Sequence, residues 1–430
     1  GVEQETEVDY ASLIRVLIVF GTRPEAIKMI PVIRALQNSK IFRPVVIATG
    51  QHSDMVQDLI TRAGIRLDAN LKVGAKHKDK APSLNRIFAR VLKGVDRIWE
   101  KQEIPEDFKS EGRRQPNNAQ VCLVHGDTTS AAAAALAAFN LQIPVMHVEA
   151  GLRTSNIMEP FPEEGNRQLI SRIASLHFAP TPVSKTNLIR EGIDADRIIV
   201  TGNTAIDTLR WAVEENVSLK EELHAIKNEQ SPLVLITAHR RENLGGGIER
   251  IAQAVAQLAS EYPKTRFVLP MHPNPLVRKT LTSILCDSAN VHLTEPLEYL
   301  EFVQLASTAK LIISDSGGIQ EEAPSLGVPV LVTRDVTERV EGLQAGTLKL
   351  VGTDKDQIIA KAREVLNNEV DASNYHNINP YGDGKAAERI TQTLAHIFCD
   401  AAPPQEFDSA HLKQSFLRFL DRDQPFKTAK

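Results

Sequence analysis

The chain has 430 residues, of which 42% are hydrophobic and 24% are charged. This length exceeds what one hydrophobic core usually supports, so we expect two domains. The formal net charge of −4 argues against a nucleic-acid-binding protein and against a membrane-surface protein. Cys122, Cys286 and Cys399 are far apart and form no CxxC motif, which argues against a disulfide framework and a thiolate zinc site.

The sequence shows no usual signal for a membrane or an export route. No apolar run approaches the roughly 18 residues that suggest a membrane helix. Residues 1–12 are acidic and have no apolar signal-peptide core, so they are expected to form a disordered leader. A cytoplasmic location is therefore expected. At the other end of the chain, residues 400–430 are expected to form a polar tail.

The first half of the chain alternates strands and helices. Residues 14–20, IRVLIVF, are almost entirely apolar, as is typical of a parallel strand buried on both faces. An amphipathic helix follows, with Pro24 near its start. Arg23 and Lys28 flank this corner, where they form either a solvated surface pair or two positive charges for a phosphate. Further strands are expected at 44–49, 121–124, 144–148, 176–179 and 198–200.

Two helices of the first half have distinctive patterns. Residues 83–101 have apolar side chains at helical spacing over several turns, which predicts a core-facing helix. Residues 131–139, AAAAALAAF, have small side chains, which predicts close packing against the sheet. The polar segment 101–120 is expected to be an exposed excursion.

Three carboxylates follow consecutive strands or their loops: Asp127, Glu149 and Glu163. Ligands of open parallel sheets bind outside the carboxyl ends of the strands. Each carboxylate alone fits a helix cap or a solvated loop. Together with Arg23 and Lys28, they favour convergence on one cleft.

The pattern restarts at about residue 204, which predicts a second doubly wound unit. His239 stands beside two arginines and a triple glycine, and this neighbourhood favours an anion site over a structural histidine. Strands are expected at 233–237, 266–270, 291–293, 311–313, from 330 onward and at 349–351.

The most informative stretch of the second half is LIISDSGGIQEEAPSLGVPVLV, residues 311–332. It predicts a strand, a glycine turn and a helix from Ile319, and such a corner favours anion binding through free N–H groups. Glu321 and Glu322 are expected in the first helical turn, where the helix dipole stabilises a carboxylate. A tight turn with dipole compensation is the alternative to a binding site. The fold class expected from these patterns is α/β, with two Rossmann-like parallel-sheet domains facing across a cleft.

Eight ordered motifs carry a resemblance to a known family: GTRPEAIKM, HGDTTSA, HVEAGLRT, PFPEEGNR, VTGNTAID, TAHRREN, DSGGIQEEAPSLGVPVL and TERVE. Over residues 16–397 the chain resembles the bacterial-type, non-hydrolysing UDP-N-acetylglucosamine 2-epimerases. The resemblance implies the glycosyltransferase B fold, with domains at 13–203 and 204–376 and a helix at 383–398 packing back on the first. It also implies a homodimer that interconverts UDP-N-acetylglucosamine and UDP-N-acetylmannosamine without nicotinamide or metal, for cell-surface polysaccharide precursors.

The same resemblance implies roles for individual residues. Family members eliminate UDP to form 2-acetamidoglucal and then add UDP back with protonation on the opposite face. Asp127 and Glu163 match the acid/base pair, with Glu149 also at the sugar. Arg23, Lys28 and His239 match positions that contact the diphosphate, and His239 is also counted in the catalytic group. Ser316 and Gly317 match positions that bind phosphate, and Glu322 matches one that binds the ribose. Phe302 and Arg339 match positions near the uridine and the diphosphate.

Several alternatives stay open at the level of sequence. Gln51, Glu163, Arg240 and His272 match an allosteric substrate site, but Asp54 stands where the family often has a second glutamine, so regulation by substrate is open. Another UDP-2-acetamido sugar could be the substrate, or the chain could be an inactive nucleotide-sugar sensor. A hydrolysing epimerase and a glycosyltransferase of the same fold fit the motifs less well. The lone DxD at 194–196 gives little support to a metal site.

Overall fold

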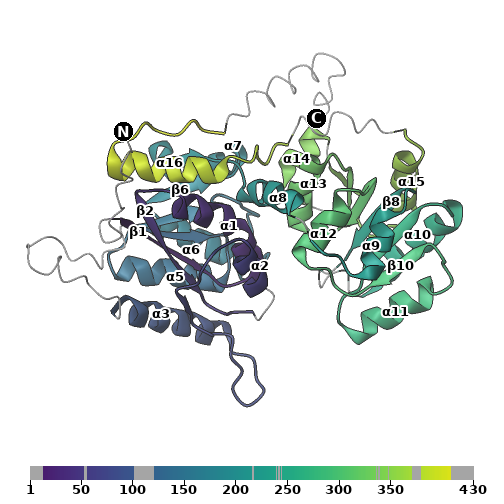
Figure 1. The fold of residues 1–430 in the computed structure, drawn as a ribbon, viewed down its shortest axis with the longest axis horizontal. Coiled ribbons are helices and arrows are strands. Elements are labelled where there is room, and N and C mark those ends of the chain that lie inside the picture. The colour runs from purple at the N-terminus through teal and green to yellow at the C-terminus, as the bar shows by residue number, and fades with distance from the viewer. Residues whose placement is uncertain are drawn as a thin grey trace, which may run out of the picture. The chain divides into compact units, whose positions relative to one another are not determined.

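The computed structural model describes residues 13–52, 56–100, 121–215, 217–238, 240, 243, 245–335, 337, 339–346, 348–369 and 379–407. The chain forms two compact units, each built around one sheet (Figure 1). The first unit ends at Thr208 and resumes at Gly382, and the second runs over Leu209–Tyr381. The leader at 1–12, the excursion at 101–120 and most of the tail lie outside the described residues.

The first unit contains a seven-stranded parallel sheet in the order β3-β2-β1-β4-β5-β6-β7. Strand order reverses between β1 and β4, which creates the switch point where doubly wound sheets bind ligands. The strands predicted from apolar runs are confirmed, whereas the two-residue β3 has no apolar run that could have predicted it. The strands are β1 (Ile14–Phe20), β2 (Phe42–Ala48), β3 (Ala69–Asn70), β4 (Val121–His125), β5 (Val145–Val148), β6 (Leu176–Ala179) and β7 (Ile198–Val200).

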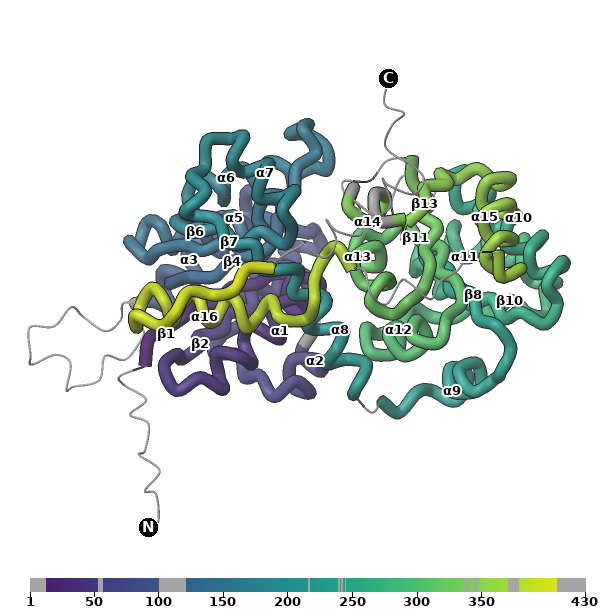
Figure 2. The backbone as a smooth tube through the Cα atoms, turned by 90° about the horizontal axis from the view of Figure 1, so that it is seen from above, coloured from purple at the N-terminus to yellow at the C-terminus, as the bar shows by residue number. Residues whose placement is uncertain are grey.

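Helices cover both faces of this sheet, as expected for a doubly wound unit. The C-terminal helix α16 (Ala386–Cys399) lies along α1 (Figure 2), and the side chain of Asp207 accepts hydrogen bonds from the free N–H groups of Ala386 and Ala387 at its start. The other helices are α1 (Arg23–Gln37), α2 (Val56–Arg62), α3 (Leu84–Glu100), α5 (Thr129–Asn140), α6 (Glu163–Ile173) and α7 (Pro182–Arg190), with a 3-10 turn at Ala195–Arg197. Helix α8 (Thr204–Glu214) begins in this unit and ends in the second.

The alanine-rich helix α5 packs as its small side chains predict. Its consecutive residues Ala131–Ala135 are buried, and the helix contacts β1, β4 and β5 as well as the neighbouring helices α3 and α6. Methyl-sized side chains let the helix backbone approach the sheet closely. This packing fixes the position of the turn that precedes α5.

The second unit contains a six-stranded parallel sheet in the order β10-β9-β8-β11-β12-β13, again confirming the predicted strands. Its strands are β8 (Leu233–Thr237), β9 (Arg266–Pro270), β10 (Val291–Thr294), β11 (Leu311–Ser314), β12 (Val330–Val332) and β13 (Leu348–Leu350). Its helices are α9 (Glu221–Asn228), α10 (Gly246–Glu261), α11 (Pro275–Leu285), α12 (Tyr299–Ala306), α13 (Gly317–Leu326), α14 (Val340–Ala345) and α15 (Lys355–Leu366). In the described part of the chain, no helix combines the length and the hydropathy that crossing a bilayer requires.

Candidate active site

The corner between β1 and α1 is organised by a buried carboxylate. Glu25 accepts hydrogen bonds from the backbone N–H groups of Gly21, at 2.6 Å, and Thr22, at 2.8 Å. A Cβ on Gly21 would lie 2.4 Å from Oγ of Ser130, so only glycine fits this close approach. Burial raises the pKa of Glu25, although these hydrogen bonds favour its charged form. Arg23 begins α1 directly after this pinned turn.

Glu25 also reaches the corner that follows β4. Thr128, the N-cap of α5, donates its hydroxyl hydrogen to Oε1 of Glu25 and accepts the N–H of Ala131. The ends of β1 and β4 are therefore tied together through one buried side chain. Because these strands flank the switch point of the sheet, this contact sets the shape of the candidate site.

Asp127 lies in this second corner and is held on several sides. His147 of β5 donates from Nε2 to the carbonyl oxygen of Gly126, at 2.7 Å, and Asn166 of α6 donates to that of Asp127, at 3.0 Å. Arg167 of α6 contacts Oδ2 of Asp127 through Nε, at 3.0 Å, and through Nη2, at 2.8 Å. Burial alone would lower the pKa of Arg167, but Asp127 and the neighbouring Glu164 raise it.

Glu149 follows β5 in a left-handed conformation, with φ of 64°, which is unusual for a residue other than glycine. Its Oε2 lies 2.9 Å from Nζ of Lys28 and 3.0 Å from Nε2 of His125. Burial alone would raise the pKa of Glu149, but Lys28 and His125 hold that pKa well below its usual value. The structure thus brings together Glu149 and Lys28, two of the predicted residues, as an ion pair.

The remaining predicted residues of the first unit lie at the start of a helix and after a strand. Glu163 is the first residue of α6, and its Oε2 is buried with no hydrogen-bond partner among the described residues. Gln51 follows β2, and its Oε1 accepts from the hydroxyl of Ser130, at 2.6 Å, and from the backbone N–H of Ser130. Gln51 therefore contacts the start of α5, three residues after Asp127.

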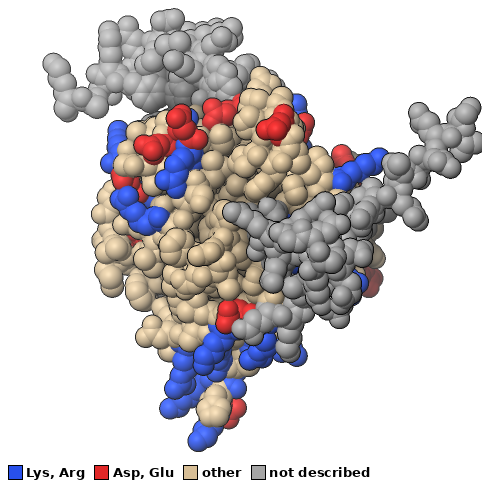
Figure 3. Space-filling view, turned by 90° about the vertical axis from the view of Figure 1, so that its left-hand side faces the viewer, with Lys and Arg blue, Asp and Glu red and all other residues tan. Residues whose placement is uncertain are grey.

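A basic hairpin begins beside Gln51. Lys78 and Asp79 both have positive φ angles, which suit a tight two-residue turn, and His77 bridges to Lys80. Lys76, Lys78 and Lys80 of this hairpin are exposed, and Figure 3 shows Lys and Arg side chains clustered at the lower end of one face of the molecule. In an otherwise acidic chain, this cluster provides a local positive field that favours anionic ligands.

In the second unit, the corner after β11 is built on a buried acid. Asp315 is fully buried and accepts from the backbone N–H of Arg240, at 3.0 Å, and from the side chain of Asn243, at 2.9 Å. Oγ of Ser314 accepts the N–H of Ser316, at 2.9 Å, and contacts the hydroxyl of Thr237. These contacts fix the turn that leads into α13.

The prediction that Glu321 and Glu322 occupy the first turn of this helix is wrong. Helix α13 begins at Gly317 rather than Ile319, with Ser316 as its N-cap, so both glutamates fall in the second turn. Glycine is tolerated at a helix start, which places two residues of the expected turn inside the helix. Oε1 of Glu321 instead lies 2.8 Å from Nε of Arg339.

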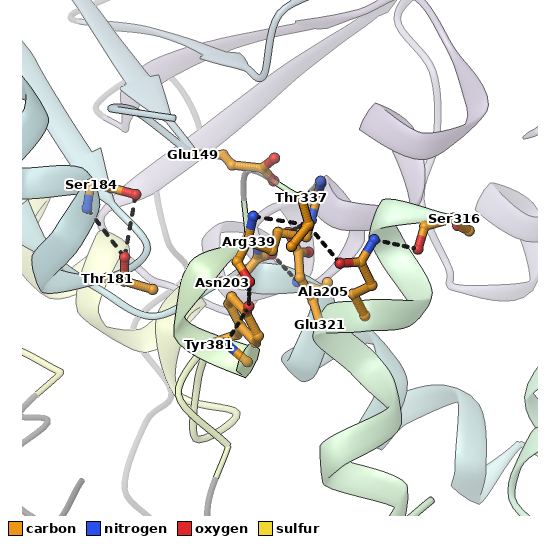
Figure 4. Close-up of polar contacts among 12 residues, drawn as sticks. Glu149, Thr181, Ser184, Asn203, Ala205, Ser316, Glu321, Thr337, Arg339 and Tyr381 are labelled. Atoms are coloured by element: carbon orange, nitrogen blue, oxygen red, sulfur yellow. Dashed lines mark hydrogen bonds and ion pairs between the residues drawn. The ribbon is translucent and has the colours of Figure 1, made fainter. Parts of the chain in front are cut away.

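Arg339 lies against the start of α13. A Cβ on Gly317 would come within 2.5 Å of the Arg339 guanidinium carbon, so this glycine is required for the close approach. Figure 4 shows Arg339 among Thr337, Glu321 and Tyr381. The hydroxyl of Tyr381 donates to the carbonyl oxygen of Arg339, at 2.8 Å, and accepts the N–H of Gly342. The helix start and the guanidinium together form a site suited to an anion.

The other predicted residues of the second unit are more scattered. Phe302 lies on α12 and packs partly buried against the core, and Glu322 lies buried on α13. His272 follows β9, and its Nδ1 accepts the N–H of Asn274 at 3.1 Å. His239 lies outside the described residues. Among those described, no group of three or more His, Cys, Asp or Glu side chains is placed to hold a metal ion.

Comparison with known proteins places these features in context. Residues 34–395 match the family model described as UDP-N-acetylglucosamine 2-epimerase. The chain is 45% identical to the UDP-N-acetylglucosamine 2-epimerase of Neisseria meningitidis, over 88% of this chain and 99% of that protein. It is also 45% identical to the enzyme of that name from Salmonella typhimurium, over 88% and 98% of the two chains.

A solved structure extends the similarity to three dimensions. The crystal structure of the Neisseria meningitidis enzyme bound to UDP-GlcNAc superposes with a TM-score of 0.76, at 45% identity, and covers 88% of this chain and 99% of that one. This similarity and the two parallel-sheet units confirm the predicted glycosyltransferase B-like class of fold.

Proposed function

The chain belongs to the UDP-N-acetylglucosamine 2-epimerase family, and we propose that it interconverts UDP-N-acetylglucosamine and UDP-N-acetylmannosamine by inversion at C2. The observation that supports this reaction most directly is the set of carboxylates at consecutive strand ends of the first unit. Asp127 and Glu149 follow neighbouring strands, and each is held by a cation, Arg167 or Lys28. Glu163 begins the helix that carries Arg167.

The proposed reaction consists of an elimination and its reversal. One carboxylate removes the C2 proton, the C–H electron pair forms the C1=C2 bond, and the C1–O bond breaks with its electrons departing on UDP. UDP then adds back at C1 of 2-acetamidoglucal, while an acid on the opposite face delivers a proton to C2. We assign this acid/base work to Asp127 and Glu163. No electrons are exchanged with a cofactor in this scheme.

Glu149 has a different role in this proposal. Its ion pair with Lys28 keeps it a carboxylate, and a negative charge near the sugar would stabilise positive charge that develops at C1 as UDP departs. Lys28 and Arg23 would in turn stabilise the departing diphosphate. His239 is proposed to contact the same diphosphate.

The second unit supplies the nucleotide-binding groups in this proposal. The hydroxyl of Ser316, the backbone N–H of Gly317 at the start of α13 and the guanidinium of Arg339 would bind phosphate oxygens. Glu322 is assigned to the ribose hydroxyls and Phe302 to the uracil ring. Gln51, Arg240 and His272 stay candidates for a second, regulatory nucleotide-sugar site.

Proton NMR of the protein with UDP-N-acetylglucosamine in D2O, in the presence of EDTA, tests the reaction. The expected result is UDP-N-acetylmannosamine with deuterium at C2. Free N-acetylmannosamine and UDP would instead indicate a hydrolysing enzyme. Unchanged nucleotide sugar that stays bound would indicate a sensor or a different UDP-2-acetamido sugar as substrate.

We further propose that the protein is a homodimer and acts in the cytoplasm, where nucleotide sugars are substrates for precursor synthesis. The family resemblance supports the dimer. Light scattering coupled to size exclusion should give about twice the 47.5 kDa chain mass. A mass of one chain at the concentration of the activity assay would contradict it.

A further inference from the structure

We propose that Arg167 is a positioning residue that orients Asp127 for proton transfer, an inference that rests on the proposed epimerase function. Both Nε and Nη2 of Arg167 contact the same oxygen of Asp127, Oδ2, at 3.0 and 2.8 Å. Among the described residues, no group hydrogen-bonds to the other oxygen, Oδ1. The guanidinium therefore holds one oxygen of the carboxylate and leaves the other available to a substrate proton.

The guanidinium is itself fixed by a buried partner. Nη1 of Arg167 donates to Oε2 of Glu164, at 3.0 Å, and the side chain of Glu164 is 0% exposed. Oε1 of Glu164 accepts from Gln168. The side chain of Arg167 is 7% exposed and that of Asp127 is 27% exposed, so the Arg167–Glu164 pair is shielded from water while Asp127 stays partly accessible. A planar guanidinium that is hydrogen-bonded to a carboxylate on each of two edges has little freedom to rotate. A residue that positions another side chain needs this rigidity.

The same helix places the other member of the acid/base pair. Glu163 and Arg167 are four residues apart on α6, so they lie on one face of the helix, one turn apart. Asn166 of this helix also holds the backbone of Asp127 through its carbonyl oxygen. Helix α6 thus contains Glu163 and also holds Asp127 in place, because Arg167 and Asn166 of this helix both contact Asp127. The two carboxylates keep a fixed spacing, which inversion requires because protons leave and arrive on opposite faces of C2.

Substitution of Arg167 tests this role through the separation of kcat from binding. Arg167→Gln should lower kcat about 100-fold, because misplacing a catalytic group by about 1 Å can cost that much. UDP affinity and KM should change by less than about threefold, since the nucleotide is assigned to other residues. Arg167→Lys, which keeps the charge but not the fork, should recover part of the loss. Arg172→Gln removes an exposed arginine from the same helix and should leave kcat unchanged.

A double variant separates positioning from folding. Arg167→Gln alone leaves Glu164 as a buried charge without its cation, which lowers the melting temperature. Glu164→Gln combined with Arg167→Gln removes both charges and should recover melting temperature while kcat stays low. Recovery of kcat together with melting temperature would overturn the positioning role, as would wild-type kcat in Arg167→Gln or Arg167→Lys. Lack of epimerisation by the wild-type protein would instead refute the proposed function.

Discussion

The two units use the same strand–turn–helix corner in chemically opposite ways. In the first unit, corners present side-chain carboxylates that other side chains hold, such as Asp127 on Arg167 and Glu149 on Lys28. In the second unit, a corner presents backbone N–H groups, with a buried carboxylate, Asp315, placed behind the turn. One corner is suited to moving protons and the other to binding an anion. Substitutions of the carboxylates in the first unit should therefore affect turnover, and those at the start of α13 in the second should affect affinity.

The sharpest test of this division is Asp127→Asn. An amide keeps the shape of the side chain but cannot take a proton, so kcat should fall by about 10²–10⁴-fold. Calorimetric titration should show UDP affinity close to that of the wild type. Asp196→Asn, in the exposed turn at Ala195–Arg197, is the matched control. Retained turnover, or lost UDP affinity, would remove Asp127 from the acid/base role.

Gly317→Ala tests the proposal that the start of α13 in the second unit binds the anion. The added methyl group would displace the Arg339 guanidinium, which its Cβ would approach to 2.5 Å. Losing one charge-assisted hydrogen bond should weaken UDP binding by about 2 kcal/mol, or roughly thirtyfold. Calorimetry with Arg339→Ala and the double variant checks the cause. Since both changes act on one guanidinium, their effects should not add, and additive losses would contradict this explanation.

The two units should also differ in their response to acid. Burial lowers the pKa of His147 to about 3 and that of His177 to about 4. The unfolded chain takes up these protons below about pH 6.5, whereas the folded unit does not, so stability is lost as pH falls below that value. At pH 5, His147 alone should lower the free energy of unfolding by about 2 kcal/mol relative to pH 7.

The chain offers one tryptophan in each unit to follow this effect. Trp99 lies in the first unit and Trp211 in the second. Urea unfolding of Trp211→Phe, which leaves the Trp99 signal, should show the acid-induced loss, and Trp99→Phe should show less. His147→Gln keeps a donor for the carbonyl of Gly126 and should reduce the pH dependence. An unchanged pH dependence in that variant would exclude His147 as the cause.

The smallest effect is expected at an exposed ion pair. Glu261 and Arg363 contact each other on the surface of the second unit. Solvent-exposed pairs of this kind contribute little to stability. Glu261→Gln should therefore leave melting temperature and UDP affinity within experimental error. A clear drop in either quantity would show that this surface matters to the fold or to binding.

The fold was largely predictable because buried parallel strands leave continuous apolar runs in the sequence. The site was predictable only in part. Lys28 and Glu149 were each identified, but nothing local indicated that they form an ion pair across 121 positions. Glu25 and Arg167 stand inside recognisable motifs, yet their partners, Thr128 and Asp127, are 103 and 40 positions away. The helix start at Gly317 was missed because glycine indicates a turn and a helix N-terminus equally well.

The return of the chain at Gly382 has a consequence for biosynthesis. Helix α16 covers α1, but the ribosome makes the whole of Leu209–Tyr381 before α16 is synthesised. At about 5–20 residues per second, the first unit waits roughly 10–35 s with that face of α1 uncovered. During this interval the side of α1 that α16 contacts in the finished fold lacks its partner. The first unit is thus the first to begin folding on the ribosome and the last to finish.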